Sequence, residues 1–157
     1  MAESGVICVE VAGSAYGIPV AEVQEVLDYR PPTRIFHAPS ALAGITSLRG
    51  EVLPIIDLAS LLDGDAETRV EAVDPRVVVV RELGGARRRA GLKVDALLGL
   101  RDAPAAGHSG VPAAVAARLG DLVLGVVSEP APAFALLSVA GIFNAPALRE
   151  LSEAPVE

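Results

Sequence analysis

The apolar residues of this chain fall in short runs rich in Val and Ile, a pattern that predicts strands rather than long helices. In the first half, turn-forming residues separate two pairs of runs, at Gly13 and in the stretch from Arg49 to Glu51. Gly50 accepts a positive φ at little steric cost and Glu51 is polar, so this pair suits a reversal. The sequence therefore predicts two β-hairpins, formed by Val6–Val11 with Ala15–Ile18 and by Ile45–Leu48 with Val52–Ile56.

The second half contains a comparable set of apolar runs. Four consecutive valines, Val77–Val80, lie between two arginines, and an unbroken run predicts a strand buried on both faces. Gly84 and Gly85 favour a reversal after it. The polar segment Gly64–Asp74 is interpreted as a linker between the halves. The other strands predicted here are Gly91–Val94, Ala96–Leu100, Leu122–Val127 and Phe134–Val139.

Helical signals are few and short. Pro19 suits a first helical turn, and Val20, Val23, Val26 and Leu27 recur at helical spacing, which predicts a short helix. Three more helices are predicted: one at Leu58–Leu62 that Asp57 caps, one at Pro112–Leu119, and one near 143–152 with Pro146 in its first turn. Arg34–Phe36 is expected to be a short extended segment.

Composition limits the possible classes of protein. With 157 residues the chain fits one domain, and the single Cys8 cannot form an intramolecular disulfide, which suits a reducing, cytoplasmic setting. Although 52% of residues are hydrophobic, polar residues and prolines interrupt every long apolar window, so we expect no direct membrane insertion. The net charge of −7 and the scarcity of aromatic residues disfavour nucleic-acid binding.

Catalytic and metal-binding motifs are not apparent. His37 and His108 both lie in proline-rich or glycine-rich stretches expected to be loops, and no nucleophile elbow or phosphate-binding loop occurs. The two histidines and Cys8 match no metal-ligand spacing, so we expect no metal, no cofactor and no enzymatic activity. The cluster Arg87–Arg89 is interpreted as a solvated edge that discourages strand pairing rather than a nucleic-acid contact.

Several short motifs follow one another along nearly the whole chain, and their combination in this order is more specific than any one of them. They are Tyr16–Val20, Val23–Val26, Pro39, Gly44–Gly50, Val52–Leu58, Val77–Val80 and Gly91–Asp95. In this set the sequence resembles the CheW family of chemotaxis coupling proteins. The resemblance implies a mainly β fold, with two small five-stranded, SH3-like β-barrel subdomains packed together and short helices. It also implies a single domain over residues 1–157, with approximate halves 6–63 and 75–143.

The same resemblance implies a function. Family members are non-catalytic adaptors in bacterial chemosensory signalling, a form of two-component signal transduction. They bridge the cytoplasmic tip of a methyl-accepting chemoreceptor and the regulatory domain of a CheA-type histidine kinase. The expected location is therefore the cytoplasm, with recruitment to membrane-associated receptor arrays. Receptor tips are helical hairpins, which suit a helix-in-groove mode of recognition.

Four residues, Val23, Glu25, Arg49 and Gly50, are expected to form the partner-binding region, and Gly44 and Gly50 are expected to form turns. Glu25 and Arg49 match the family's functionally sensitive glutamate and arginine, and Val23 falls in the receptor-facing neighbourhood. A guanidinium can hold a carboxylate through two hydrogen bonds, so Glu25 and Arg49 are predicted to pair. The alternative is that Arg49 is only a solvated charge on the hairpin.

The sequence also departs from the family pattern. Ser138 follows Leu137 where the family often has an aspartate, Phe36 replaces a usual proline, and the turn at Glu129–Pro132 is atypical. These departures leave open a divergent scaffold of a non-flagellar pathway, such as one for type IV pilus motility. A small β-barrel that binds a ligand or an oligonucleotide is the alternative from another class, and it would require a basic, aromatic face.

Overall fold

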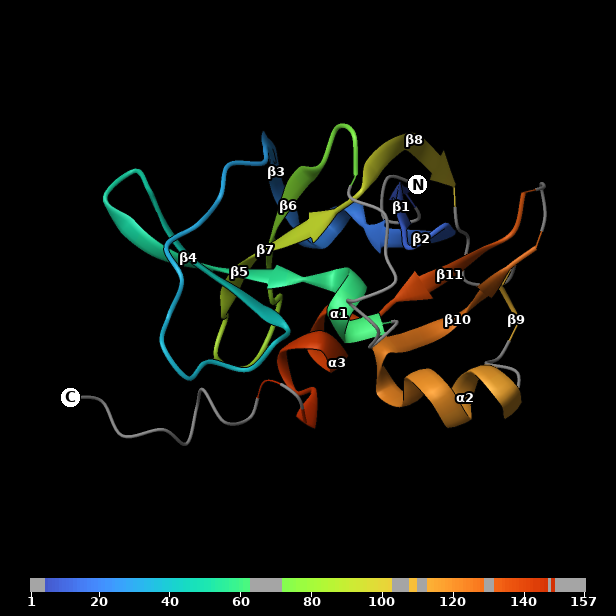
Figure 1. Ribbon diagram of the computed structural model, residues 1–157. Coiled ribbons are helices and arrows are strands. Elements are labelled where there is room, and N and C mark those ends of the chain that lie inside the picture. The colour runs from blue at the N-terminus through green and yellow to red at the C-terminus, as the bar shows by residue number, and fades with distance from the viewer. Residues whose placement is uncertain are drawn as a thin grey trace.

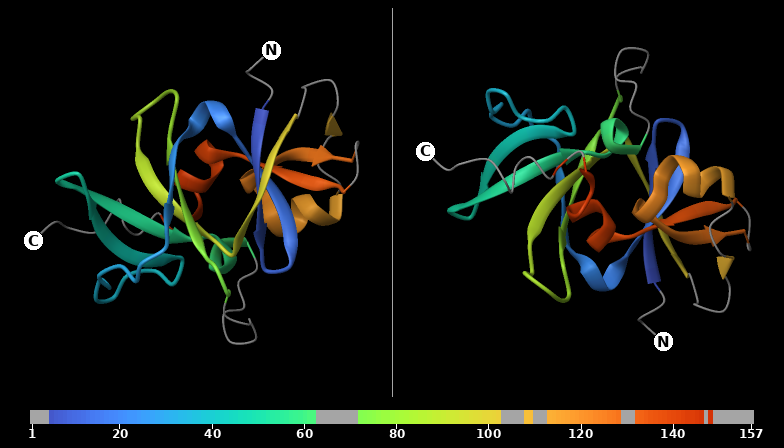
Figure 2. Two further views of the ribbon diagram at one scale, coloured as in Figure 1. Left: turned by 90° about the horizontal axis from the view of Figure 1, so that it is seen from above. Right: turned by 90° about the horizontal axis from the view of Figure 1, so that it is seen from below.

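The apolar runs form strands that divide between two sheets lying side by side (Figures 1 and 2). The computed structural model describes residues 5–62, 72–102, 108–109, 113–128, 132–146 and 148. In spatial order, one sheet contains β8 (Ala96–Asp102), β1 (Gly5–Val11), β2 (Ser14–Pro19), β11 (Phe134–Leu137), β10 (Val123–Val127) and β9 (His108–Ser109). The other contains β3 (Val23–Asp28), β6 (Arg76–Arg81), β7 (Arg89–Val94), β5 (Glu51–Asp57) and β4 (Leu42–Leu48).

The predicted fold class, mainly β with two SH3-like sheets and short helices, is confirmed, with two differences in detail. One sheet has a sixth strand of only two residues, β9, and the hydrogen-bonded ladders of the described residues are open rather than closed barrels. Both sheets combine strands from each half of the sequence, through the antiparallel pairs β1 with β8 and β3 with β6 and the parallel pairs β2 with β11 and β5 with β7. The expected halves 6–63 and 75–143 therefore do not coincide with the two sheets.

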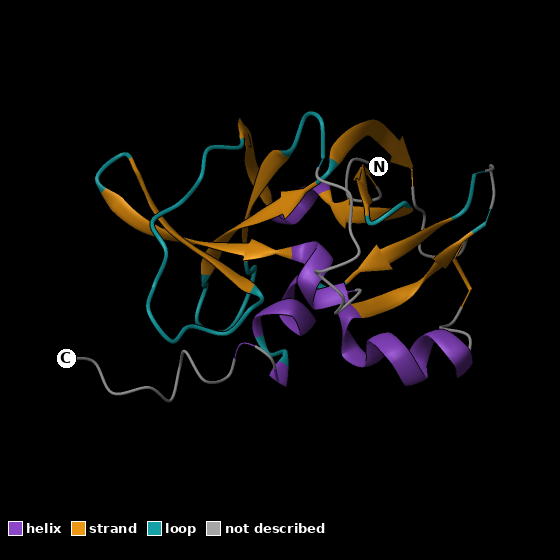
Figure 3. Ribbon diagram, in the orientation of Figure 1, coloured by secondary structure: helices purple, strands orange, loops and turns teal. Residues whose placement is uncertain are grey.

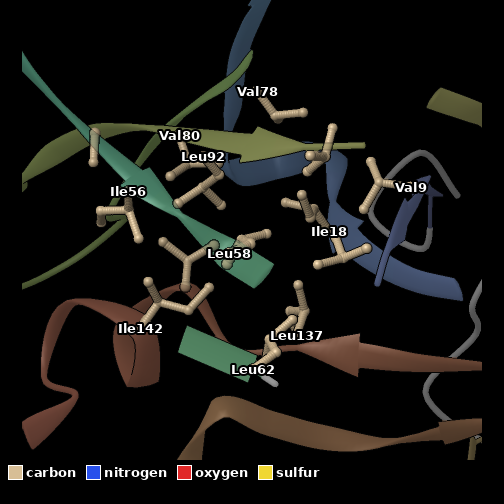
Figure 4. Close-up of a cluster of buried hydrophobic side chains, with 14 of the residues drawn as sticks. Val9, Ile18, Ile56, Leu58, Leu62, Val78, Val80, Leu92, Leu137 and Ile142 are labelled. Carbon is tan, nitrogen blue, oxygen red and sulfur yellow. The ribbon is translucent and has the colours of Figure 1, made fainter. Parts of the chain in front are cut away.

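Among the described residues, buried side chains form three clusters, one within each sheet and a larger one between them. The valines of β6 alternate between two of these clusters: Val78 and Val80 join the central cluster, whereas Val77 and Val79 join the cluster of the five-stranded sheet. This alternation explains why an unbroken apolar run is needed at β6. Figure 4 shows the central cluster, to which strands of both sheets contribute along with helical residues such as Leu58 and Ile142.

Short helices complete the core (Figure 3). They are α1 (Leu58–Leu62), α2 (Ala113–Leu119) and α3 (Val139–Phe143), together with the 3₁₀ turns η2 (Val20–Glu22) and η4 (Gly120–Leu122). As predicted, Asp57 caps α1, because its carboxylate accepts hydrogen bonds from Ala59 N at 3.2 Å and from the Ser60 hydroxyl at 3.1 Å. None of the helices in the described part of the chain has the length and apolar character needed to cross a lipid bilayer.

The helix predicted after Pro19 is wrong beyond its first turn. Only Val20–Glu22 is helical, and Val23 begins strand β3. A β-bulge between Val23 and Glu25 sets two residues of β3 against one of β6, so Val23 and Val26 face the same core three positions apart. The bulge therefore gives the apolar residues of this strand the spacing that is typical of a helix.

The C-terminal part also differs from expectation. Val139 begins α3 instead of ending a strand, and Ser138 caps this helix by accepting a hydrogen bond from Gly141 N at 3.0 Å. Ser and Asp both cap helices well, which explains how a serine serves at this position. The helix expected near 143–152 falls largely outside the described residues, although residues 146 and 148 are helical.

Other segments are only partly described. The expected linker Gly64–Asp74 lies mostly outside the described residues, as does the turn Glu129–Pro132. The segment Arg34–Phe36 forms no strand; Thr33 makes a single β-bridge, and a turn follows at Phe36. His108 lies in β9 rather than in a loop.

Candidate functional site

The candidate site begins at the turn between β4 and β5, at the end of the molecule far from β9–β11 (Figure 1). Leu48 pairs with Glu51, so the two turn residues are Arg49 and Gly50, with φ of 50° and 82°. Two positive φ values are typical of the type I′ turn that matches strand twist. The reversal predicted at Gly50 and Glu51 therefore occurs one residue earlier. Arg49 holds a left-handed conformation that costs a non-glycine residue about 1 kcal/mol.

Arg49 and Glu25 form a bidentate ion pair, as predicted. Arg49 donates from Nη2 to Glu25 Oε1 at 2.7 Å and from Nη1 to Oε2. The Arg49 side chain is 67% exposed and that of Glu25 only 22%, so the arginine lies across a half-buried carboxylate. Two parallel hydrogen bonds fix both the distance and the orientation of the pair.

This pair links the two edges of the five-stranded sheet. Glu25 belongs to edge strand β3, whereas Arg49 follows edge strand β4. A β-bridge also forms between Thr33 and Ile45, in which each amide donates to the other carbonyl at 2.8 Å. The ion pair thus connects the two edge strands, and the bridge ties the segment between β3 and β4 to β4.

Gly44 allows that bridge to form, and it is not a turn residue as predicted. It lies within β4 at a bulge, with φ of 152°. A Cβ at this position would lie 2.3 Å from the carbonyl oxygen of Thr33. Glycine is therefore needed for close approach of two backbone segments, not for chain reversal.

The remaining predicted residue, Val23, is less accessible than expected. It is half-buried and packs against the central cluster, so its side chain contributes to the core as well as to the surface near Glu25.

Hydrogen bonds extend the pair into a wider polar surface. Gln24 donates from Nε2 to Glu25 at 3.3 Å and accepts from Arg81 Nη2 at 3.2 Å, while Arg89 forms an ion pair with Glu51. Sequence reasoning missed Gln24, Arg81 and Arg89 as members of the site. The polar residue in the bulge of β3 was the available signal, but the pairing of β5 with β7 that brings Glu51 to Arg89 has no local signature.

The interpretation of Arg87–Arg89 as a solvated edge is wrong for two of its residues. Arg89 pairs with Glu51, and Arg88 holds the buried Glu82 through Nε at 2.7 Å and Nη2 at 2.8 Å. Hydrogen bonding to Arg88 lowers the pKa of Glu82 despite its burial. These arginines therefore have specific partners within the fold.

The pKa of Glu25 should show whether the ion pair with Arg49 forms in solution. Hydrogen bonding to Arg49 is the largest cause that lowers the pKa of Glu25, from an ordinary 4.5 to about 2. A depressed carboxyl pKa contributes stability that is present above 4.5 and is lost as the pH falls toward 2. We expect Arg49→Ala to return the pKa of Glu25 toward 4.5, measured by NMR titration of the side-chain carboxyl. An unchanged pKa in that variant would contradict the geometry.

Metal ligands do not gather in the described part of the chain, where no group of three His, Cys, Asp or Glu side chains could hold an ion. Cys8 is buried, and burial is the main cause that raises the pKa of its thiol. His37 lies in a turn, and its ring contacts that of Phe36 at a tilt of 58°, with 4.1 Å between ring centroids.

Comparisons with known proteins agree with the motif pattern. The model of a family described as CheW-like domain matches residues 5–147. Chemotaxis protein CheW of Klebsiella aerogenes is 39% identical over 80 residues, which are 51% of this chain and 45% of that protein. Protein FrzA of Myxococcus xanthus is 35% identical over 105 residues, 66% of this chain and 62% of that protein. The matched region thus spans about half to three fifths of these relatives.

A solved structure has the same fold. The scaffolding protein TtCheW from Thermoanaerobacter tengcongensis superposes with a TM-score of 0.79 at 24% identity, covering 92% of this chain and 95% of that one. At this identity the likeness concerns the arrangement of the chain.

Proposed function

Because this chain belongs to the CheW-like domain family, we propose that it is a non-catalytic adaptor that couples chemoreceptors to a CheA-type histidine kinase. The observation that carries the proposal is the family match over residues 5–147, which contains both sheets and the Glu25–Arg49 pair. An adaptor needs surfaces that bind two partners at once. It requires neither a reaction nor a cofactor.

The partners in this proposal are the cytoplasmic tip of a methyl-accepting chemoreceptor and the regulatory domain of the kinase. The protein acts in the cytoplasm and joins membrane-associated arrays by binding these two. We assign Glu25, Arg49 and Gly50 to the coupling surface, with Val23 supporting it from beneath. What supports this assignment is exposure: the Arg49 guanidinium is presented to solvent in a fixed orientation by the turn and by Glu25.

The test is capture of each partner by the purified protein. We expect Arg49→Ala to weaken capture of the receptor tip or of the kinase regulatory domain by about tenfold, because interface arginines often carry a large share of binding energy. The melting temperature should change little, since Ala and Arg bear the same strain at this turn and the Arg49 side chain is mostly exposed.

Two further variants make the test specific. Arg49→Lys keeps the positive charge but cannot form the bidentate hydrogen bonds to Glu25, so this variant should bind the partners more weakly than the original protein. Arg30→Ala removes an exposed arginine beyond the other end of β3 and should capture both partners normally. Full capture of both partners by Arg49→Ala would overturn the assigned surface, and failure of the original protein to capture either one would overturn the adaptor proposal.

A further inference from the structure

An open groove lies beside the Glu25–Arg49 pair and is lined by Glu51, Val52, Arg81, Arg87 and Arg89. Its volume is about 460 Å³. The parallel pairing of β5 with β7 brings the start of β5 next to the hairpin between β6 and β7, which supplies all three arginines. We refer to these five residues as the arginine groove.

The charge in the groove is opposite to that of the whole protein. The chain carries a net charge of −7, yet three guanidinium groups here accompany a single carboxylate. Arg81 and Arg89 are direct cross-strand neighbours in the antiparallel ladder of β6 and β7. Like charges at such positions destabilise a sheet, so the fold keeps this arrangement against a local cost. Departures of this kind are expected at functional sites.

The three arginines differ in how they are held. Arg89 pairs with Glu51, and Arg81 bonds only to the neutral amide of Gln24 among the contacts described, so its charge is not cancelled there. Arg87 lies in the turn with φ of 53°, and its exposed side chain has no ion pair within the described residues. Two of the three charges are therefore available to an incoming anion.

The groove is also continuous with the candidate site. Arg81 and Glu25 bond to the same Gln24 side chain, and the charge of Arg89 contributes to the lowered pKa of Glu25. Val52, 69% exposed, adds an apolar contact at the wall of the groove. A ligand in the groove would thus lie next to Arg49.

We propose that the arginine groove binds an acidic segment of a protein partner, whose carboxylates contact Arg81 and Arg87 and whose apolar side chain covers Val52. This inference rests on the proposed adaptor function and adds the chemistry of the partner. The lining of the groove selects the occupant: guanidinium forks suit carboxylates, and the exposed Val52 at its wall suits a peptide that also carries an apolar side chain. Such contacts contribute mainly to association rate and specificity.

The experiment compares Arg87→Glu with Arg30→Glu, two variants with the same change in net charge at opposite ends of the five-stranded sheet. Dissociation constants are measured for the receptor tip and for the kinase regulatory domain. We expect Arg87→Glu to bind one of them about tenfold more weakly. Added salt should weaken the original complex more than that of the variant, because fewer charges remain to be screened. Arg30→Glu should match the original protein within about twofold.

The outcomes separate this inference from the adaptor proposal. If the original protein binds a partner and Arg87→Glu binds like Arg30→Glu, the groove inference is overturned and the adaptor proposal stands. If the original protein binds neither partner, the adaptor proposal fails, and a labelled polyglutamate peptide then tests the groove against polyglutamine of the same length. Binding of polyglutamate that Arg87→Glu abolishes supports the groove. Absence of such binding, or tighter binding of an oligonucleotide or of inorganic phosphate, overturns it.

Discussion

Gly44→Ala is expected to lower the free energy of unfolding by about 3–5 kcal/mol, at the upper end of the range for single substitutions. The added Cβ would lie 2.3 Å from the carbonyl oxygen and 2.9 Å from the carbonyl carbon of Thr33. Two backbone hydrogen bonds of 2.8 Å between Thr33 and Ile45 hold that carbonyl in place. Relief of the clash requires Thr33 to move away and its bridge to Ile45 to break, and φ of 152° adds strain for any side chain.

Two other glycines serve as matched controls in the same denaturant titration. Gly50→Ala keeps a positive φ of 82° but meets no atom within 4 Å, so it should cost only about 1 kcal/mol. Gly84→Ala meets nothing within 4 Å and has no positive φ, so its effect should stay within about 0.5 kcal/mol. A cost for Gly44→Ala no larger than that for Gly50→Ala would show that the Thr33 segment moves freely.

The sequence predicted best what depends on neighbouring residues. The valine run of β6, the hairpin of β4 and β5, and the cap by Asp57 each follow from a local pattern, and all three occur in the structure. The class of fold was likewise accessible, because short β-branched runs bounded by Gly and Pro allow few alternatives. Contact between Glu25 and Arg49 was predicted only with the help of a family resemblance, since 24 positions separate them.

What the sequence did not reveal depends on the partners of each strand. The bulge in β3 became visible only once β6 lay beside it, and without it the spacing of Val23 and Val26 resembles that of a helix. Arg81 and Arg89 are cross-strand partners only because of the register between β6 and β7, which the long loop between these strands does not reveal in the sequence. The sequence interpretation placed Arg88 in solvent because its partners, Glu82 and the end of α3, come close to it only in the folded chain.

Arg88→Ala is expected to lower the free energy of unfolding by about 2–4 kcal/mol, because it leaves the carboxylate of Glu82 buried without its cation. The Glu82 side chain is only 9% exposed; that of Arg88 is 36% exposed, which keeps the expected cost below that of a fully buried pair. Arg88 also donates to Asn144 Oδ1 at 3.1 Å and lies over the Phe143 ring at 5.1 Å from its centroid. Removing it therefore also loosens the hairpin from the end of α3.

The pH dependence of this loss identifies its cause. Hydrogen bonding to Arg88 lowers the pKa of Glu82 below 4.5, so the stability from the pair is present above that pH and is lost as the pH falls through the depressed value. Without the Arg88 side chain, burial favours the protonated carboxyl of Glu82, so the variant should approach the original protein in stability under acidic conditions. Arg89→Ala is the control: its partner Glu51 is exposed, and the cost should stay below about 1 kcal/mol. A loss for Arg88→Ala that does not vary with pH would assign the effect to packing on Phe143 rather than to the charge of Glu82.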